Sequence, residues 1–297
     1  MQLSRRGVLI AGAALTSGVV LSTRSALAEP SPADPGLTGS LVALERQHNA
    51  RIGVYAANLQ SGRLVTHRDL ERFAVCSTFK TYLAARVLQR SERGELALTD
   101  TVTVRAADLL PNSPITETRV DQPISLSELC AAAVQRSDNA ASNYLLTAIG
   151  GPQAITDFAR SIGDQETRLD RWETELNAAV PGDPRDTSTP QALGNGNREL
   201  VIGNVLGSDA RAQLVDWMST NVTSSLRPGL PAGWTLADKT GSGDYGTTND
   251  VGVASGPDGQ SVVLAVMVRS AGDDPDAEGF RPLMAEIAAL LIPALAA

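Results

Sequence analysis

The sequence predicts an α+β fold: one antiparallel sheet, built from both termini and flanked by helices, with an all-helical inserted subdomain. Two observations predict it. Residues alternate with the period of two that is typical of strands near both ends of the chain, at 51–67 and at 234–269. Roughly between residues 70 and 215, apolar residues recur at helical spacing instead. Strands at both ends with helices between them imply that the two ends pair in a single sheet.

These patterns divide the chain into three regions. We expect a removable segment over residues 1–28, an α/β subdomain formed by 29–69 and 216–297, and a helical subdomain over 70–215. Cleavage after residue 28 leaves 269 of the 297 residues, which is long enough for one large domain with an ample core. The two subdomains are therefore expected to form one domain.

The N-terminal part predicts a helix followed by a hairpin. Residues 37–47 have the period of a short helix, with Ser40 as the candidate N-cap. Strand-like stretches at 51–58 and 63–67 are joined by turn residues at 60–62. A strong helix follows over 78–93, and Gly94 is expected to end it.

Capping signals place the helices of the insert. Residues 98–123 have no periodicity and several prolines, so we expect irregular structure there. Ser125 and Glu128 form a capping box, and the polar triplet 137–139 separates the helix that it begins from the next one. The helices expected from these signals are 126–135, 140–149 and 152–163.

The C-terminal half begins with a long loop and ends in strands. Residues 163–189 have little periodicity, and long loops in compact domains are usually functional. A helix beginning at Pro190 is weakened by the glycines within 194–197, and Ser208 is expected to cap the following helix. The remaining expected elements are strands at 234–240, 247–255 and 261–269 and a tail helix from Pro282.

The first residues have the order of an export signal. Ser4-Arg5-Arg6 precedes an apolar run at 7–21, and Ala26-Leu27-Ala28 offers small residues for cleavage. The paired arginines are typical of a twin-arginine signal. The run is shorter than the ~20 residues that span a bilayer, and no cysteine follows it, so no stable membrane anchor is expected. We expect export to the periplasm or the medium after cleavage near Ala28.

Composition excludes several classes of function. The removed segment contains three arginines and no acid, so the mature chain has 22 basic and 33 acidic residues, a formal charge of −11. Such a chain is poorly suited to nucleic acid or anionic membranes. The only histidines, His48 and His67, lack the spacing of metal ligands. We expect a monomer that acts on small molecules without metal or cofactor.

The strongest local signal is the stretch from Cys76 to Lys80. Ser77 lies three residues before Lys80, so the two side chains share one face of a helix. A desolvated lysine can accept a proton from a serine hydroxyl and make it a nucleophile. Of 25 basic residues, 23 are arginine, and the only lysines are Lys80 and Lys239. Since arginine can replace lysine as a surface charge but hardly ever releases its proton, the retained lysines indicate function.

A glycine pattern offers a competing interpretation. Gly241, Gly243 and Gly246 have the spacing of a dinucleotide-binding loop. That loop must lead into a helix, whereas the residues that follow have a strand pattern. We interpret these glycines instead as a strand edge that a ligand approaches closely.

Three short motifs together carry a resemblance to a known family. Ser77-x-x-Lys80, Ser137-Asp138-Asn139 and Lys239-Thr240-Gly241 occur in the order known from class A β-lactamases and penicillin-binding proteins. The stretch 171–177, Arg-Trp-Glu-Thr-Glu-Leu-Asn, resembles the omega-loop signature of the class A serine β-lactamases. The resemblance covers nearly all of the mature sequence. It is closest to cefotaxime-hydrolysing and actinobacterial members, and it implies the serine β-lactamase and penicillin-binding-protein fold.

The resemblance implies a role for each motif residue. Ser77 would attack the lactam carbonyl, its N–H and that of Ser242 would hold the oxyanion, and Glu173 would activate water for deacylation. Either Lys80 or Glu173 would take the serine proton. Ser137 would transfer a proton, Asn139 would bind the substrate side chain, and Asn177 would position the water. The substrate carboxylate would be bound by Lys239, Thr240, Ser242 and Arg281, and Gly241 would also belong to the substrate-binding strand. Arg171 and Asp186 would close the loop, and Cys76 would support the nucleophile.

The chain also departs from the family pattern. Asn112 stands where many members have an aromatic gate, which leaves side-chain selectivity open. Cys130 and Cys76 each form a disulfide in some relatives, but their partner positions are here Ala84 and Gly243. We therefore expect two free thiols.

Two other functions compete with a secreted β-lactam hydrolase. One is a D-Ala-D-Ala peptidase that penicillin merely acylates, and the other is a non-catalytic penicillin sensor. Glu173 disfavours both, because neither needs a deacylating carboxylate.

Overall fold

The computed structural model describes residues 35–296 of the chain. The predicted export signal and its cleavage site near Ala28 lie outside these residues. Within them, no helix has both the length and the apolar character needed to cross a membrane.

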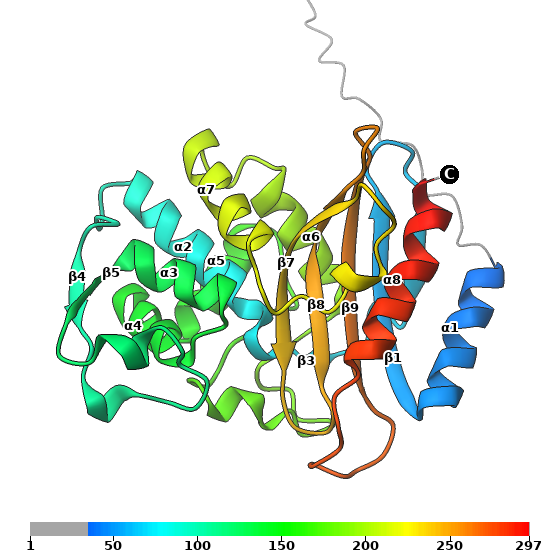
Figure 1. Ribbon diagram of the computed structural model, residues 1–297, viewed down its shortest axis with the longest axis horizontal. Coiled ribbons are helices and arrows are strands. Elements are labelled where there is room, and N and C mark those ends of the chain that lie inside the picture. The colour runs from blue at the N-terminus through cyan, green and yellow to red at the C-terminus, as the bar shows by residue number, and fades with distance from the viewer. Residues whose placement is uncertain (1–34, 297) are drawn as a thin grey trace, which may run out of the picture.

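A five-stranded antiparallel sheet joins the two ends of the chain, as predicted (Figure 1). The strands lie in the order β2-β1-β9-β8-β7, so the N-terminal β1 pairs with the C-terminal β9 in the centre. Their bounds are β1 Ala50–Asn58, β2 Leu64–His67, β7 Thr235–Ser242, β8 Thr248–Ser255 and β9 Ser261–Ser270. The α+β class and the pairing of the termini are therefore confirmed.

Two helices from opposite ends of the chain cover one face of the sheet. These are α1 (Pro35–His48) and α8 (Arg281–Ala296), which lie along the same side of the strands in Figure 1. Alternate strand residues such as Ile52 and Val54 point toward them and form one hydrophobic cluster with Leu41 and Ile287. The period-two pattern near the termini thus arises because alternate strand residues are buried under these two helices.

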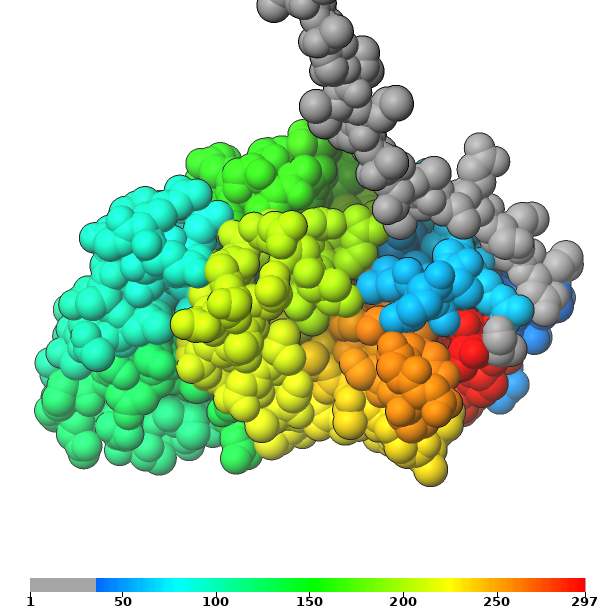
Figure 2. All heavy atoms as spheres, turned by 90° about the horizontal axis from the view of Figure 1, so that it is seen from above, coloured from blue at the N-terminus to red at the C-terminus, as the bar shows by residue number. Residues whose placement is uncertain are grey.

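The remaining helices lie on the other face of the sheet and beyond its β7 edge. Helix α6 packs directly against β1, β8 and β9. Seen from above, the inserted helices gather at one end of the molecule and the C-terminal strands and α8 at the other (Figure 2). The helices are α2 Lys80–Glu92, α3 Leu126–Gln135, α4 Asn139–Ile149, α5 Gln153–Ser161, α6 Pro190–Val201 and α7 Ser208–Ser219.

Most capping signals hold, and two are wrong. The Ser125 hydroxyl accepts the Glu128 N–H at 3.2 Å, and the Glu128 carboxylate accepts the Ser125 N–H at 3.0 Å, so the capping box is confirmed. Ser40 is not an N-cap but lies inside α1, where its hydroxyl donates to the Gly36 carbonyl. Gly207, not Ser208, is the N-cap of α7.

Short elements escaped the periodicity argument. Residues 98–123, expected to be irregular, contain β4 (Thr101–Thr103), which pairs with β5 (Pro123–Ser125). A three-residue strand is too short to show a period of two. The other short elements are β3 Phe73–Ala74, β6 Thr187–Ser188 and the 3₁₀ turns η1 Cys76–Phe79, η2 Ala106–Asp108, η3 Thr116–Arg119, η4 Glu175–Ala178 and η5 Arg227–Gly229.

The glycines that weaken α6 have a packing reason. A Cβ on Gly196 would lie 1.7 Å from the Tyr82 hydroxyl, and one on Gly194 would lie 2.6 Å from the Tyr55 ring. Tyr82 is fully buried and donates to Asp164 at 2.7 Å, so its ring cannot retreat without losing this bond. The two glycines therefore lower the helix propensity of α6, but their lack of a side chain lets α6 approach both the sheet and α2.

Gly196→Ala should consequently destabilise the protein despite its better helix propensity. We expect the free energy of unfolding to fall by about 1–3 kcal/mol, the usual effect of overpacking a core. The matched control is Gly39→Ala in α1, where a Cβ would meet nothing within 4 Å. That change should raise stability by up to about 1 kcal/mol. Chemical denaturation of both variants measures the difference, and equal effects would contradict this packing argument.

Candidate active site

The turn η1 holds Ser77 against strand β7. The Val75 N–H donates to the Asp186 carbonyl at 2.8 Å, and Cys76 adopts a left-handed backbone with φ 44°. A Cβ on Gly241 would lie 2.8 Å from the Val75 carbonyl oxygen and 3.2 Å from the Ser77 nitrogen. The absence of a side chain at Gly241 thus lets the nucleophile turn approach the strand closely, whereas the predicted close approach of a ligand stays a prediction.

Lys80 lies one turn beyond Ser77 and is completely buried. Its ammonium group donates to Asn139 Oδ1 at 2.7 Å and to the Ser137 carbonyl at 2.9 Å, and it lies 2.9 Å from Glu173 Oε1. Burial lowers the pKa of Lys80 below its ordinary value, and the Glu173 carboxylate opposes that shift. Lys80 thus connects its own helix to the 137–139 motif and to the loop that carries Glu173.

Glu173 connects the nucleophile to the loop predicted at 163–189. Its Oε1 accepts the Ser77 hydroxyl at 3.3 Å, and its Oε2 accepts the Asn177 amide at 2.6 Å. The side chain is fully buried, as is that of Lys80. A serine within reach of a carboxylate that is itself held by a cation and an amide has the geometry of an activated nucleophile.

Asn143 is a site residue that the motifs did not identify. Its side-chain amide donates to the Glu173 carbonyl at 2.9 Å and accepts the Glu173 N–H at 3.1 Å. Both backbone groups of Glu173 are therefore held by one side chain of α4. The available signal was its position four residues after Asn139, which places it on the same helix face.

Ser137 contacts the side chains of both Lys80 and Lys239. The Lys239 ammonium group donates to Ser137 Oγ at 3.1 Å and to the Thr240 carbonyl at 2.8 Å. Burial, and next the nearby Lys80 ammonium, lower the pKa of Lys239 to about 7. A lysine with such a pKa can both donate and accept a proton near neutrality.

Asp138 and Asn112 hold this second motif in place. The buried Asp138 carboxylate caps α4 through the Ala141 N–H at 2.9 Å and accepts the Thr116 N–H at 2.9 Å. Asn112, at φ 57°, donates its amide to the Ser137 carbonyl at 3.0 Å. The residue that replaces the aromatic gate thus supports the motif backbone, and asparagine tolerates this left-handed conformation.

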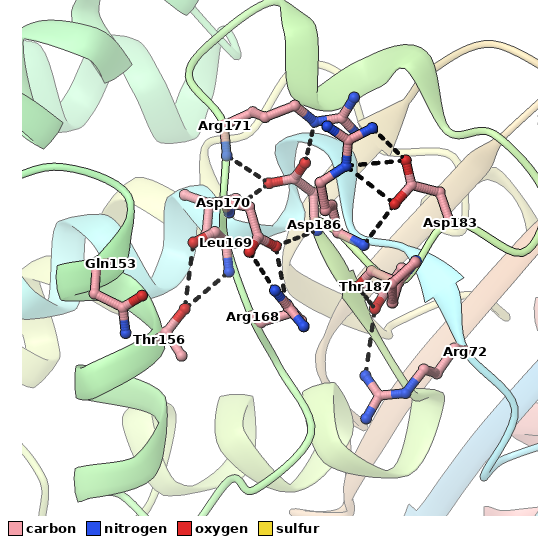
Figure 3. Close-up of polar contacts among 12 residues, drawn as sticks. Arg72, Gln153, Thr156, Arg168, Leu169, Asp170, Arg171, Asp183, Asp186 and Thr187 are labelled. Atoms are coloured by element: carbon pink, nitrogen blue, oxygen red, sulfur yellow. Dashed lines mark hydrogen bonds and ion pairs between the residues drawn. The ribbon is translucent and has the colours of Figure 1, made fainter.

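The loop is closed at its base by the predicted ion pair, shown in Figure 3. Arg171 Nε donates to Asp186 Oδ2 at 2.6 Å, and the Asp170 and Arg171 N–H groups both donate to Asp186 Oδ1. Asp186 is completely buried. Since its carbonyl also holds Val75, Asp186 connects the loop that carries Glu173 to the turn that carries Ser77.

Above these buried groups lies a cavity of about 280 Å³. Arg281 reaches it from the first residue of α8, and Ser242 from the end of β7. Lys80, Glu173 and Lys239 are completely or almost completely buried and are not among its lining residues. The lining residues are Ser77, Asn112, Ser137, Asn139, Asn177, Thr223, Thr240, Gly241, Ser242 and Arg281. Every predicted site residue therefore lies in or directly beside one region of the molecule, and only Thr223 among the lining residues was not named in advance.

Cys76 and Cys130 are buried free thiols, as expected, and burial raises the pKa of both. A Cβ on Gly243 would lie 2.8 Å from the Cys76 sulfur, which shows how closely that thiol is enclosed. Across residues 35–296, no three His, Cys, Asp or Glu side chains are grouped as metal ligands.

Comparisons with known proteins agree on one family. The model of the "Beta-lactamase enzyme family" matches residues 37–294. A β-lactamase of Streptomyces lavendulae is 46% identical over 98% of this chain and 97% of its own, and β-lactamase CTX-M-8 of Citrobacter amalonaticus is 47% identical over 76% and 78%.

Solved structures show the same likeness. The crystal structure of a β-lactamase from Desulfarculus baarsii superposes with a TM-score of 0.85 at 41% identity, covering 88% of this chain and 98% of that one. An ancestral class A β-lactamase superposes with a TM-score of 0.82 at 46% identity, covering 87% and 99%.

Replacement of Asp186 should loosen the whole loop. Asp186→Ala leaves Arg171 and two backbone N–H groups without their acceptor, and breaking a buried pair costs about 3–5 kcal/mol. We expect a loss of this order in unfolding free energy and faster hydrogen exchange over residues 168–186. Asp183→Ala is the control on the same loop (Figure 3), because its partner Arg185 is largely exposed. The control should leave stability nearly unchanged, and similar losses in both variants would contradict the assigned role.

Proposed function

The chain belongs to the class A β-lactamases of the β-lactamase enzyme family, and from this premise we propose that it hydrolyses penicillins and cephalosporins through an acyl-enzyme on Ser77. Opening the lactam ring inactivates these antibiotics, so the proposed activity confers resistance. The observation that carries the proposal is the position of Glu173, between the Ser77 hydroxyl at 3.3 Å and the Asn177 amide at 2.6 Å.

Acylation begins with removal of the serine proton. Two groups can act as the base: Glu173 accepts the Ser77 hydroxyl directly, and Lys80 lies beside Glu173 with a pKa lowered by burial. A base positioned this way typically contributes ~10²–10⁴-fold to the rate. The Ser77 oxygen then attacks the lactam carbonyl and a tetrahedral oxyanion forms.

The oxyanion is stabilised by backbone N–H groups of Ser77 and Ser242. Gly241 supports this assignment, because its lack of a side chain lets β7 approach the Ser77 nitrogen. One such donor is typically worth ~3 kcal/mol of barrier. Both serines line the cavity, so a carbonyl oxygen that enters it reaches the two residues from the solvent side.

Ring opening requires a proton on the lactam nitrogen. Ser137 lines the cavity and accepts a hydrogen bond from Lys239 at 3.1 Å. Since Lys239 has a pKa of about 7, it can replace the proton that Ser137 gives to the nitrogen. Ser137 thus donates the proton to the lactam nitrogen, and Lys239 then reprotonates Ser137.

Deacylation needs a water molecule activated beside the ester. Before this step, the proton taken from Ser77 returns through Lys80 and Ser137 to Lys239, which leaves Glu173 ionised. Glu173 then takes a proton from a water that the Asn177 amide helps to hold, and the water oxygen attacks the ester carbonyl. As the ester bond breaks, Glu173 passes that proton to the Ser77 oxygen, which restores the free serine. This step distinguishes a hydrolase from a D-Ala-D-Ala peptidase that is only acylated, and from a sensor without turnover. Asn143 supports it by holding both backbone groups of Glu173.

Binding residues surround the reacting groups. Arg281 is an exposed cation at the cavity, and together with Lys239, Thr240 and Ser242 it attracts the substrate carboxylate. Asn139 lines the side where the acylamide side chain would lie. All proposed steps use protein side chains and water and require no cofactor.

Export is a further part of the proposal and rests on the sequence of the first 28 residues. A twin-arginine receptor reads the arginine pair itself, so charge alone is insufficient. Replacing Arg5 and Arg6 by lysine should therefore keep the protein inside the cell. Fractionation with immunoblotting measures the distribution, and normal export of this double variant would count against the twin-arginine route.

Glu173→Ala tests the mechanism. Without the base, water attack on the ester should slow by about 10²–10⁴-fold, while Lys80 still permits acylation. We expect a penicilloyl adduct on Ser77, seen by mass spectrometry, and almost no steady turnover. The matched control is Glu175→Ala, an exposed carboxylate two residues along the same loop, which should turn over normally. Wild-type turnover in Glu173→Ala would show that the proposed mechanism is wrong.

A further inference from the structure

Thr223 lies in the segment after α7 and contacts β7 at the wall of the cavity. Its hydroxyl oxygen is 2.5 Å from that of Thr240, and both residues line the cavity. None of the steps above uses Thr223. Such a short contact between two hydroxyl groups requires that one of them donates and the other accepts.

The neighbouring Asn221 has only one possible orientation. Its Oδ1 accepts the backbone N–H of Thr223 at 2.9 Å, and its Nδ2 lies 3.3 Å from the backbone carbonyl of Asp238 and 3.1 Å from the Asp238 carboxyl group. A backbone N–H can only donate and a backbone carbonyl can only accept, so a flipped amide would lose both bonds. Asn221 is also completely buried. Its Oδ1 is therefore a fixed acceptor.

This orientation determines the direction of the two hydroxyl groups. The Thr223 hydroxyl donates to Asn221 Oδ1 at 2.7 Å, and this uses its single hydrogen. The hydrogen between Thr223 and Thr240 must then belong to Thr240. In this arrangement Thr240 offers only lone pairs to the cavity, which repel a carboxylate.

We propose that Thr223 is a hydrogen-bond switch for the substrate carboxylate: it accepts from Thr240 while the cavity is empty and must turn to donate when a carboxylate binds. This inference rests on the proposed function, because it assigns the substrate carboxylate to Thr240. When Thr240 donates to the carboxylate, two oxygens 2.5 Å apart would have no hydrogen between them. Thr223 removes this repulsion by rotating its hydroxyl hydrogen toward Thr240. The rotation breaks the hydrogen bond from Thr223 to Asn221 Oδ1.

The switch works against binding. Turning Thr223 loses one neutral hydrogen bond to Asn221, which corresponds to a roughly two- to tenfold change in an equilibrium constant. The Thr223 donation then strengthens the Thr240 bond to the carboxylate, but only by about 10–30% of one bond. The loss is larger than the gain. Thr223 is thus a positioning residue that weakens carboxylate binding and so favours release of the product acid.

The experiment measures binding without turnover. In the Ser77→Ala background, which cannot form the ester, calorimetry gives the dissociation constant of benzylpenicillin with and without Thr223→Val. Valine keeps the shape of threonine but neither accepts nor donates, so Thr240 is free to face the ligand. We expect the dissociation constant to fall about threefold. Thr223→Ser retains the hydroxyl and should restore the original value.

Benzylpenicillin methyl ester separates this role from a structural one. The ester has no carboxylate, so Thr223→Val should leave its dissociation constant unchanged. Arg281→Ala is the positive control, since loss of a cation at the same cavity should weaken benzylpenicillin binding. If Thr223→Val does not fold, Thr223→Ala makes the same test.

The outcomes distinguish the inference from the proposed function. An unchanged or higher dissociation constant, or an equal shift for acid and ester, overturns the switch. Binding that follows the expected pattern, with no benzylpenicillin hydrolysis by the wild type, contradicts the proposed function alone. Absence of benzylpenicillin binding to Ser77→Ala refutes both.

Discussion

The buried ion pair between Lys80 and Glu173 is the constraint on which the site depends. Both side chains have lost all contact with solvent, and such a pair is favourable only when further hydrogen bonds satisfy its remaining donors and acceptors. Asn139 and the Ser137 carbonyl satisfy the ammonium group, and Asn177 and Ser77 satisfy the carboxylate. The groups that make the pair tolerable are also the groups that the proposed chemistry uses.

These partners come from elements that the sheet and helices hold separately. Lys80 begins α2, Asn139 begins α4, and Glu173 lies on the long loop shortly before the 3₁₀ turn η4. Asn143 fixes the loop backbone from α4, and Asp186 fixes the base of the loop and the turn before Ser77. Precision at the nucleophile therefore comes from a few polar side chains that cross between elements, and less from the elements themselves.

The sequence predicted the elements that have a repeating residue pattern and the site that contains a rare residue type. Period-two alternation located the sheet, and the two retained lysines located the site, because both signals can be read without knowing which residues meet in the fold. Asn143 and Thr223 were missed because a lone asparagine or threonine has no meaning until its partner is known, and those partners lie 30 and 17 residues away. Gly194 and Gly196 were interpreted only as residues that weaken a helix. The structure shows that a larger side chain at either position would collide with a tyrosine ring from another element. Pairing across the fold, and not local preference, decides such positions.

The burial of every lysine has a consequence for how the protein can be labelled. Lys80 and Lys239 are the only lysines in the chain, and both are completely buried. Reagents that modify primary amines, such as succinimidyl esters and aldehyde fixatives, therefore find no lysine on the folded surface and are left with the α-amino group. Incorporation of such a label above one equivalent reports exposure of the protein interior, so the chain carries its own chemical sensor of unfolding.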